Sequence, residues 1–244
     1  MGMPKCLGMV VASCGQECPR AVKMTIAGAD ALALARPTGF RQTEARITGK
    51  PMSHEIELQQ YPKEITLKDG SKCELRPLRK EDEEHFHEFF LAVPEGERMF
   101  IKHRVTDPQI IRDWCQNIDL GRNLPVLAWM DGKIVGDATL HQELGGWKRH
   151  IGRVSVLVLP KYRGRGLARA LVTEIGNLAR DLGLKKIEAE FIGEQEAAIK
   201  MFALLGFSNL LRLENYVRDM QAIDHDYILM GMELKTDEEY AGVG

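Results

Sequence analysis

Residues 161–169 combine positive charge with glycine in a pattern that suits the binding of phosphate. Glycines stand at Gly164 and Gly166, and four basic side chains surround them with no acid between. Glycine lets main-chain N–H groups come close to a ligand, and a helix predicted to begin near Leu167 adds the positive end of its dipole. These features predict a turn that binds a polyanion, and the alternative is an ordinary connection with solvated arginines. The four basic residues are Lys161, Arg163, Arg165 and Arg169.

Two other glycine-rich loops do not match this stretch. A nucleotide P-loop ends in Gly-Lys-Ser or Gly-Lys-Thr, and neither follows Gly164 or Gly166. A dinucleotide fingerprint needs a small residue where Arg169 stands. A nucleotide-binding protein is therefore disfavoured as an interpretation of this turn.

The strand that leads into the turn makes the interpretation more specific. Residues 154–159 form a β-branched run that predicts a buried strand, and Pro160 ends it because proline cannot donate to a sheet ladder. The pattern Arg163-x-x-Gly166-x-Ala168 follows directly. It resembles the pyrophosphate turn of the GNAT acetyltransferase superfamily, whose members bind acetyl-coenzyme A.

The resemblance extends over residues 75–234. Residues 186–192 and 196–205, followed by Gly206-Phe207, are similar to the next strand and helix of that family. The resemblance implies an α/β fold with a mixed, mostly antiparallel central sheet and helices on both faces. It also implies direct transfer of an acetyl group from acetyl-coenzyme A to a primary amine, with no metal and no covalent enzyme intermediate.

The resemblance further implies which residues hold acetyl-coenzyme A. By position, backbone groups of Val156, Leu157 and Val158 bond the pantetheine arm and polarise the thioester carbonyl. Gln195 stands where many relatives carry asparagine, and its amide is expected to bond the pantetheine from one methylene further away. The turn residues expected at the pyrophosphate are Arg163, Gly164, Arg165, Gly166, Leu167, Ala168 and Arg169.

Acetyl transfer also needs a group that takes a proton from the amine, since a lysine amine is mostly protonated at pH 7. Glu190 is the candidate base, because it lies near the end of the predicted strand 186–192, where some relatives place theirs. The alternative is that Glu188 and Glu190 are solvated or pair with Lys185 and Lys186. Other candidates for the base, in a predicted loop, are His141, Glu143 and His150.

Two positions depart from the family pattern. Many relatives carry a tyrosine that protonates the sulfur of coenzyme A where this chain has Phe202, which cannot donate a proton. Water, another tyrosine such as Tyr216 or Tyr227, or unassisted loss of the thiolate then fills that role. Relatives also often carry a carboxylate where Arg153 stands, so no base is expected from there.

Turn residues and periodicity predict the elements before the turn. Lys68-Asp69-Gly70 and Asp131-Gly132 each separate two β-rich runs, and each therefore predicts a hairpin. Between the hairpins, one helix begins at residues 81–82 with three phenylalanines on one side and ends before Pro94. A second helix at residues 109–118 follows the N-cap and first-turn proline of Thr106-Asp107-Pro108.

The elements after the turn are predicted in the same way. Leucine and isoleucine at helical spacing indicate a helix at residues 167–182, which Gly183 ends. Because a helical crossover joins them, the strands on either side of this helix are expected to lie parallel. The last two strands are expected to pair antiparallel. The predicted strands are residues 64–67, 71–78, 125–130, 133–140, 151–159, 186–192, 210–218 and 226–234.

Composition limits the class of protein. The 244 residues are 44% hydrophobic and 28% charged with a formal net charge of −2, which suits one globular domain and disfavours a nucleic-acid binder. No apolar run reaches the roughly 20 residues that span a bilayer, so we expect a soluble, cytoplasmic protein, monomeric or homodimeric. The five cysteines fit no complete metal signature, because Cys14 and Cys18 lack a second pair, and reduced thiols are expected.

Residues 1–51 differ from the rest of the chain. They carry seven basic and three acidic residues and little apolar periodicity, which predicts a poorly structured basic arm beside a domain at residues 52–244. An extension upstream of a natural start at Met52 and an organelle transit peptide are the alternatives. Residues 11–14 also resemble a lipoprotein cleavage box, but the apolar run before them is shorter than a signal sequence uses.

The sequence therefore predicts an N-acetyltransferase that uses acetyl-coenzyme A, with a protein lysine, a protein N-terminus or a small amine as the acceptor. The first alternative is a non-catalytic acyl-coenzyme A sensor or regulatory module, which the absence of the tyrosine at Phe202 keeps open.

Overall fold

The computed structural model describes residues 58, 60–101 and 103–234. Most of the predicted globular domain falls within this part, and the arm predicted at residues 1–51 lies outside it. The boundary between arm and domain therefore stays a prediction.

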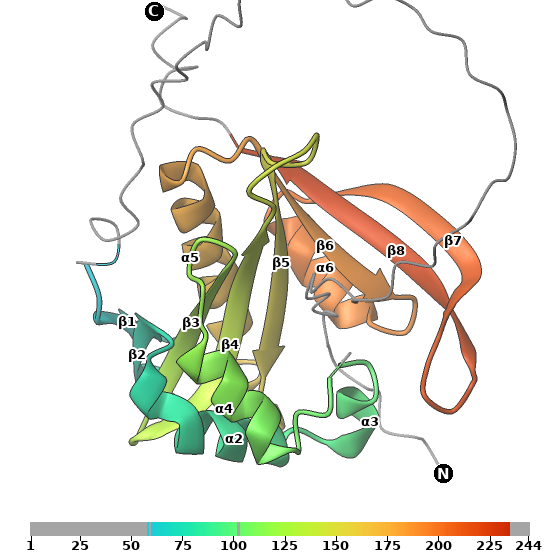
Figure 1. Cartoon of the computed structure of the whole chain (residues 1–244). Coiled ribbons are helices and arrows are strands. Elements are labelled where there is room, and N and C mark those ends of the chain that lie inside the picture. The colour runs from blue at the N-terminus through green and yellow to red at the C-terminus, as the bar shows by residue number, and fades with distance from the viewer. Residues whose placement is uncertain (1–57, 59, 102, 235–244) are drawn as a thin grey trace, which may run out of the picture. The chain divides into compact units, whose positions relative to one another are not determined.

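One sheet holds all the strands of the described part. They are β1 (Lys63–Thr66), β2 (Lys72–Pro77), β3 (Asn123–Met130), β4 (Lys133–Gln142), β5 (Ile151–Val158), β6 (Lys186–Ile192), β7 (Ser208–Arg218) and β8 (Asp224–Glu233). Their order in space is β1-β2-β3-β4-β5-β6-β8-β7, and every neighbouring pair is antiparallel except β5 and β6. Figure 1 shows β1 and β2 at one edge and the long β7–β8 hairpin at the other. The predicted mixed, mostly antiparallel sheet is confirmed.

Helices cover both faces of this sheet, as predicted. The helical elements are η1 (Lys80–Asp82), α2 (Glu83–Ala92), α3 (Glu95–Arg98), α4 (Pro108–Gln116), η2 (Pro160–Tyr162), α5 (Leu167–Asp181) and α6 (Glu196–Leu204). Leu171 and Ile175 of α5 join Phe202 of α6 in one buried cluster, while Phe89 of α2 and Ile111 of α4 belong to another. The sheet is thus packed between α5 and α6 on one face and α2 and α4 on the other.

Local sequence explains where the helices begin and end. Asp107 caps α4, because its carboxylate accepts a hydrogen bond from the Gln109 N–H at 2.9 Å, and Pro108 occupies the first turn. Gly183 follows α5 in a left-handed conformation (φ 76°), and the Leu184 N–H donates back to the Ala179 carbonyl at 2.9 Å. Both helix ends therefore follow from the residue types predicted to make them.

The feature that matters most for function is the limited pairing of the parallel strands β5 and β6. Their register joins Ile151 with Lys186, residue 152 with residue 187, and Arg153 with Glu188, and within the described part it goes no further. On its other side β5 stays paired with β4 as far as Val158. The two strands therefore part, and β6 forms no ladder with the backbone of residues 154–158.

Candidate active site

The parting of β5 and β6 leaves the backbone that the family resemblance assigns to acetyl-coenzyme A without a strand partner on the β6 side. Val156, Leu157 and Val158 all lie beyond the last paired residue, Arg153. Their side chains are buried in the two clusters, with 5–7% of their surface exposed. From these three residues, only main-chain N–H and C=O groups are then available to a ligand between the strands, as expected for hydrogen bonds to an extended amide chain.

The glycine turn follows directly and has the conformation that an anion site requires. Gly164 and Gly166 both have positive φ, at 78° and 88°. Gly166 is the N-cap of α5, and no side chain caps the helix there. Because the first N–H groups of a helix have no partner within the helix, the turn and the start of α5 together present main-chain donors and the positive helix end.

The arginines of the turn are not all solvated. The guanidinium of Arg163 donates to both carboxylate oxygens of Glu97, at 2.9 and 2.6 Å, and its Nε donates to the Val158 carbonyl at 2.8 Å. Glu97 is itself 8% exposed. Arg163 thus ties the end of β5 to α3, and its side chain holds the turn in place. Lys161 and Arg169 are both exposed.

A second turn packs against the first, which the sequence did not predict. The Lys68 N–H donates to the Arg165 carbonyl at 3.0 Å, and the Arg165 guanidinium lies 3.2 Å from the Asp69 carboxylate. The aliphatic part of Lys68 lies over Gly166. The turn of the β1–β2 hairpin therefore adds a fifth cation beside the glycine turn. Lys68 was identified only as part of a turn, because nothing in the local pattern reports a contact with so distant a part of the chain.

Gln195 and Phe202 are both buried, and both make contacts within the fold. Gln195 is 4% exposed, and its Oε1 accepts a hydrogen bond from the Ile192 N–H at 3.1 Å. Phe202 is fully buried, with its ring edge-on to Phe191 and Phe207 at centroid distances of 4.9 and 4.8 Å. Gln195 therefore fixes the loop between β6 and α6, and Phe202 belongs to the core.

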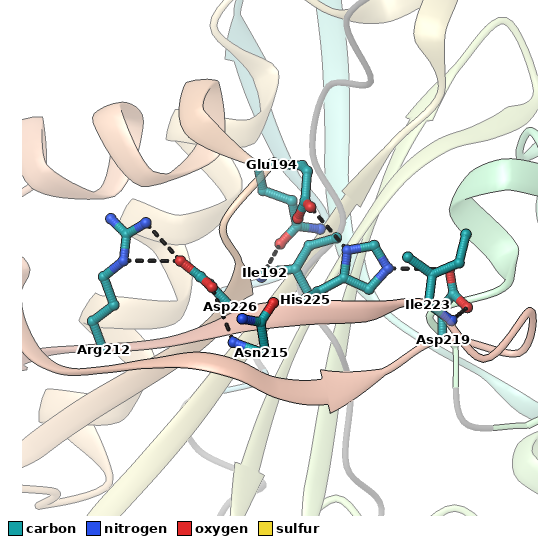
Figure 2. A network of polar contacts seen from close by, with 9 residues as sticks. Ile192, Glu194, Arg212, Asn215, Asp219, Ile223, His225 and Asp226 are labelled. Carbon is teal, nitrogen blue, oxygen red and sulfur yellow. Dashed lines mark hydrogen bonds and ion pairs between the residues drawn. The ribbon is translucent and has the colours of Figure 1, made fainter.

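The same loop is tied to the β7–β8 hairpin by His225. Figure 2 shows its ring between Glu194 and Asp219, with Nδ1 2.9 Å and Nε2 3.1 Å from their carboxylates. Burial alone would lower the pKa of His225, but the hydrogen bonds to these carboxylates outweigh burial and raise it. A raised pKa means that the protonated ring stabilises the fold at low pH, and that this stabilisation is lost as the pH rises through the folded value.

Glu190 lies on β6 beyond the point where the strands part, and it is not simply solvated. Its Oε1 is 3.2 Å from Nη1 of Arg153, and its side chain is 20% exposed. Tyr227 on β8 forms a hydrogen bond with Glu190, and burial, followed by the charge of Glu190, raises the pKa of the tyrosine. Arg153 is thus a basic side chain in contact with Glu190.

The three other candidate bases do not lie in one place. Glu143 and His150 are exposed in the loop between β4 and β5. His141, which was expected in that loop, lies on β4 instead, with Nδ1 2.7 Å from Oδ1 of Asn123 and Nε2 3.2 Å from Oγ of Ser155. His141 thus faces the cofactor strand, whereas the two loop residues do not join it.

Asp137 is a titratable group that the sequence did not single out. It pairs with Leu157 across β4 and β5, is 8% exposed, and accepts hydrogen bonds from Oγ1 of Thr139 at 3.3 and 3.4 Å. Burial raises the pKa of Asp137 to about 7, although the Thr139 hydrogen bonds act in the opposite direction. The sequence places Asp137 in a predicted strand, but an aspartate there carries no local sign of its own burial.

We expect Asp137→Asn to change how stability depends on pH. In the unfolded chain an aspartate has an ordinary pKa near 3.9, so between about pH 4 and 7 the folded protein keeps a proton that the unfolded chain has lost. This makes the wild-type protein less stable as the pH rises, by up to ~1.4 kcal/mol per pH unit in that window. The asparagine variant lacks this loss, so its stability relative to wild type increases from pH 4 to pH 8.

Urea unfolding at pH 4, 6 and 8 measures the effect. Asp131→Asn, in the exposed turn between β3 and β4, is the matched control and should keep the wild-type pH dependence. Identical pH dependence in Asp137→Asn and wild type would show that the buried carboxyl is ionised throughout, and the assignment of its raised pKa would be wrong.

Two further observations bear on the class of the site. Residues 58, 60–101 and 103–234 contain no group of three His, Cys, Asp or Glu side chains placed to hold a metal ion. In the same part of the chain, none of the helices has the length and apolar character needed to cross a membrane.

Comparisons with known proteins agree with this geometry. The model of the acetyltransferase (GNAT) family matches residues 84–207, which run from α2 to the residue before β7. The acetyltransferase SG1711 of Sodalis glossinidius is 27% identical over 168 residues, covering 68% of this chain and 99% of that protein.

Solved structures share the fold. The GNAT domain of S. lividans PAT superposes with a TM-score of 0.58 at 19% identity, covering 70% of this chain and 96% of that one. The protein yncA from Salmonella typhimurium, solved with its cofactor acetyl-CoA, has a TM-score of 0.58 at 20% identity over 68% and 95% of the two chains. The ribosomal-protein-S18-alanine N-acetyltransferase from Escherichia coli has a TM-score of 0.53 at 18% identity, with coverage of 67% and 95%.

Proposed function

The chain belongs to the GNAT family of acetyltransferases, and we propose that it moves an acetyl group from acetyl-coenzyme A to a primary amine by direct transfer. The observation that carries this proposal is the combination of parted strands with a glycine turn at the end of β5. One feature suits an extended amide arm and the other suits a pyrophosphate, and coenzyme A contains both in one molecule. The acceptor, a protein amine or a small amine, meets the thioester in a ternary complex.

The residues present fit acetyl-coenzyme A. Main-chain groups of Val156, Leu157 and Val158 would hold the pantetheine arm, since their side chains are buried and their backbone is not paired with β6. Main-chain donors of the turn would hold the pyrophosphate, from Gly164 through Gly166 to Ala168. The turn is surrounded by the positive charge of Lys68, Lys161, Arg165 and Arg169, and Arg163 keeps it in place.

Glu190 is proposed as the group that takes the proton from the acceptor amine. It lies on the opposite strand of the parted pair, and its carboxylate is partly exposed. Arg153 and Tyr227 hold the carboxylate in one orientation, which favours proton transfer along a defined direction. Since Phe202 lies in the core, the thiolate leaves unassisted or takes its proton from water or a tyrosine such as Tyr227.

A primary amine as acceptor is consistent with the names of structural relatives, several of which are alanine N-acetyltransferases of ribosomal proteins. The charge of the chain supports no particular amine, since the net charge is −2. A cytoplasmic location and a monomeric or homodimeric state accompany this proposal as predictions.

The decisive experiment is a thiol-release assay with acetyl-coenzyme A and a panel of primary amines: peptides with a free N-terminus, peptides with an internal lysine, polyamines and aminoglycosides. We expect one class to release free thiol in step with acetylation of the amine. A protein that binds acetyl-coenzyme A but acetylates no member of the panel would instead be an acyl-coenzyme A sensor.

Competition calorimetry with coenzyme A and ATP tests the remaining alternative. Coenzyme A should bind and ATP should fail to displace it, because ATP lacks the pantetheine arm that the parted strands accommodate. Equal competition by ATP would indicate a nucleotide-binding site and would contradict the proposal.

A further inference from the structure

Hydrogen bonds join three side chains, on strands β3, β4 and β5, beside the point where β5 and β6 part. Nδ1 of His141 lies 2.7 Å from Oδ1 of Asn123, and its Nε2 lies 3.2 Å from Oγ of Ser155. Asn123 and His141 are direct partners across β3 and β4, and His141 pairs with Arg153 across β4 and β5. Neither Asn123 nor Ser155 was identified from the sequence, because the contacts depend on strand register.

The hydrogen bonds among these three side chains run in one direction. The carbonyl oxygen of Asn123 can only accept, so Nδ1 of His141 must carry the proton. In a neutral ring Nε2 then has a lone pair and can only accept, so the hydroxyl of Ser155 must donate to it. The hydroxyl proton of Ser155 therefore points toward His141 on β4, and the lone pairs of Oγ point away from that ring.

His141 stays neutral across the working range of pH. Burial lowers the pKa of His141 to about 4, and the positive charge of Arg153 acts in the same direction. A ring this weakly basic cannot draw a proton from a serine hydroxyl, so the arrangement differs from a nucleophilic triad despite its similar contacts. What the neutral ring supplies is a fixed orientation of the serine.

Ser155 stands at the point where the strands part. Arg153 and Glu188 form the last pair of the parallel register, and Ser155 and Glu190 are each two residues further on. Residues two apart in a strand point to the same face, so Ser155 and Glu190 lie on one face on opposite sides of the gap. The contact between Arg153 and Glu190 across the gap supports this placement.

We propose that the Asn123–His141–Ser155 chain makes Ser155 Oγ a fixed hydrogen-bond acceptor for an N–H of the acceptor amine. The role rests on the proposed function. A neutral primary amine has two N–H donors and one lone pair. With one N–H on Ser155 and the other on Glu190, the lone pair points along a single direction, which is the positional advantage that enzymes derive from bound nucleophiles. Ser155 contacts the substrate, whereas His141 and Asn123 act as positioning residues.

The most informative variant reverses the direction of the hydrogen bonds from Asn123 to Ser155 and leaves the shapes of the side chains unchanged. In Asn123→Asp, a carboxylate beside Nδ1 favours the protonated ring, whose Nε2 must then donate to Ser155. The serine hydroxyl turns outward as a donor and opposes the amine N–H. In wild type, kcat/KM for the best amine of the panel already falls at low pH, because the amine and Glu190 become protonated. In Asn123→Asp we expect it to fall more steeply as the pH is lowered through the new pKa of His141, which adds a second acid limb to the profile.

Three further variants, Ser155→Ala, His141→Ala and the double variant, test whether Ser155 and His141 act through one contact. Ser155→Ala should lower kcat/KM roughly tenfold, the size expected for one neutral hydrogen bond, with little effect on the Kd of coenzyme A. The double variant Ser155→Ala/His141→Ala should be no worse than the worse single variant, because both remove the same contact. Asn209→Asp on the exposed strand β7 is the control for the added charge and should keep the wild-type pH profile.

Nitrogen-15 NMR of His141 provides a readout that needs no acceptor. The proposal requires a neutral ring with its proton on Nδ1 from pH 5 to pH 8 in wild type, and an imidazolium within that range in Asn123→Asp. An Nε2–H tautomer, or ordinary titration near pH 6.5 in wild type, would overturn the directional chain.

Failure of this inference is distinguishable from failure of the proposed function. An active wild type whose Asn123→Asp and Ser155→Ala variants keep full activity and the wild-type pH profile would refute the role of Ser155 alone. A wild type that acetylates no amine would refute the proposed function, and the role of Ser155 with it.

Discussion

Replacing Gly166 by valine is expected to weaken the binding of coenzyme A by ~100-fold, about 2.7 kcal/mol, while the protein stays folded. Gly166 has φ of 88°, which a β-branched residue adopts only under strain. The new side chain would also stand 3.2 Å from Cγ of Lys68, which is flexible and can move. The main effect is therefore on the backbone of the turn, whose N–H groups would no longer converge on a pyrophosphate.

Calorimetry with coenzyme A measures this loss, and thermal unfolding confirms that the variant is folded. Gly146→Val is the matched control, because Gly146 lies in the β4–β5 loop, also has positive φ, at 75°, and leaves open space within 4 Å of an added Cβ. This control variant should suffer similar local strain and keep the wild-type affinity for coenzyme A. Unchanged affinity in folded Gly166→Val would remove the basis for the pyrophosphate assignment.

Local signals account for most of the fold that could be predicted. Asp131-Gly132 between β-rich runs defines the β3–β4 hairpin, and Asp107 with Pro108 defines the start of α4. The parallel arrangement of β5 and β6 follows from the helical crossover that joins them. Such features depend on a few neighbouring residues, which is why the sequence alone predicts them.

Long-range placement could not be predicted in the same way. The last two strands were expected as an antiparallel pair, and they are, but no local signal indicates that β8 lies between β6 and β7. The contact between Arg163 and Glu97 joins residues 66 apart, and an arginine in a basic turn looks solvated until its partner is known. Burial likewise distinguishes Asp137 from a surface aspartate, and burial depends on the whole packed sheet.

The candidate site likewise has one part that local sequence predicts and another part that it does not. Its backbone component, the strand at residues 154–158 and the glycine turn, depends on local conformation and is visible in the residue types. Its side-chain component depends on register: His141 was expected in a loop and lies on β4, where strand pairing brings it to Ser155. A sequence reports which residues can do chemistry more readily than which of them meet.

Glu190→Gln is expected to lower turnover by roughly 10²–10⁴, the usual effect of losing a general base, with coenzyme A affinity unchanged. Glutamine keeps the shape of the side chain and can still accept from Arg153 and Tyr227, so the surrounding contacts persist while the proton acceptor is lost. Turnover is measured from pH 6 to pH 10 with the best amine of the panel.

Glu188→Gln is the matched control for this last test, because Glu188 lies two residues earlier on the same strand, and its 3.5 Å contact is with Lys148 in the β4–β5 loop. It should retain wild-type turnover. The loss in Glu190→Gln should shrink at high pH, where more of the amine is already neutral and a base is needed less. Full activity across the pH range would exclude Glu190 as the base and direct attention to Glu143 or water. Loss of coenzyme A binding would instead mean that Glu190 holds β6 in place through Arg153, and that the proton leaves by another route.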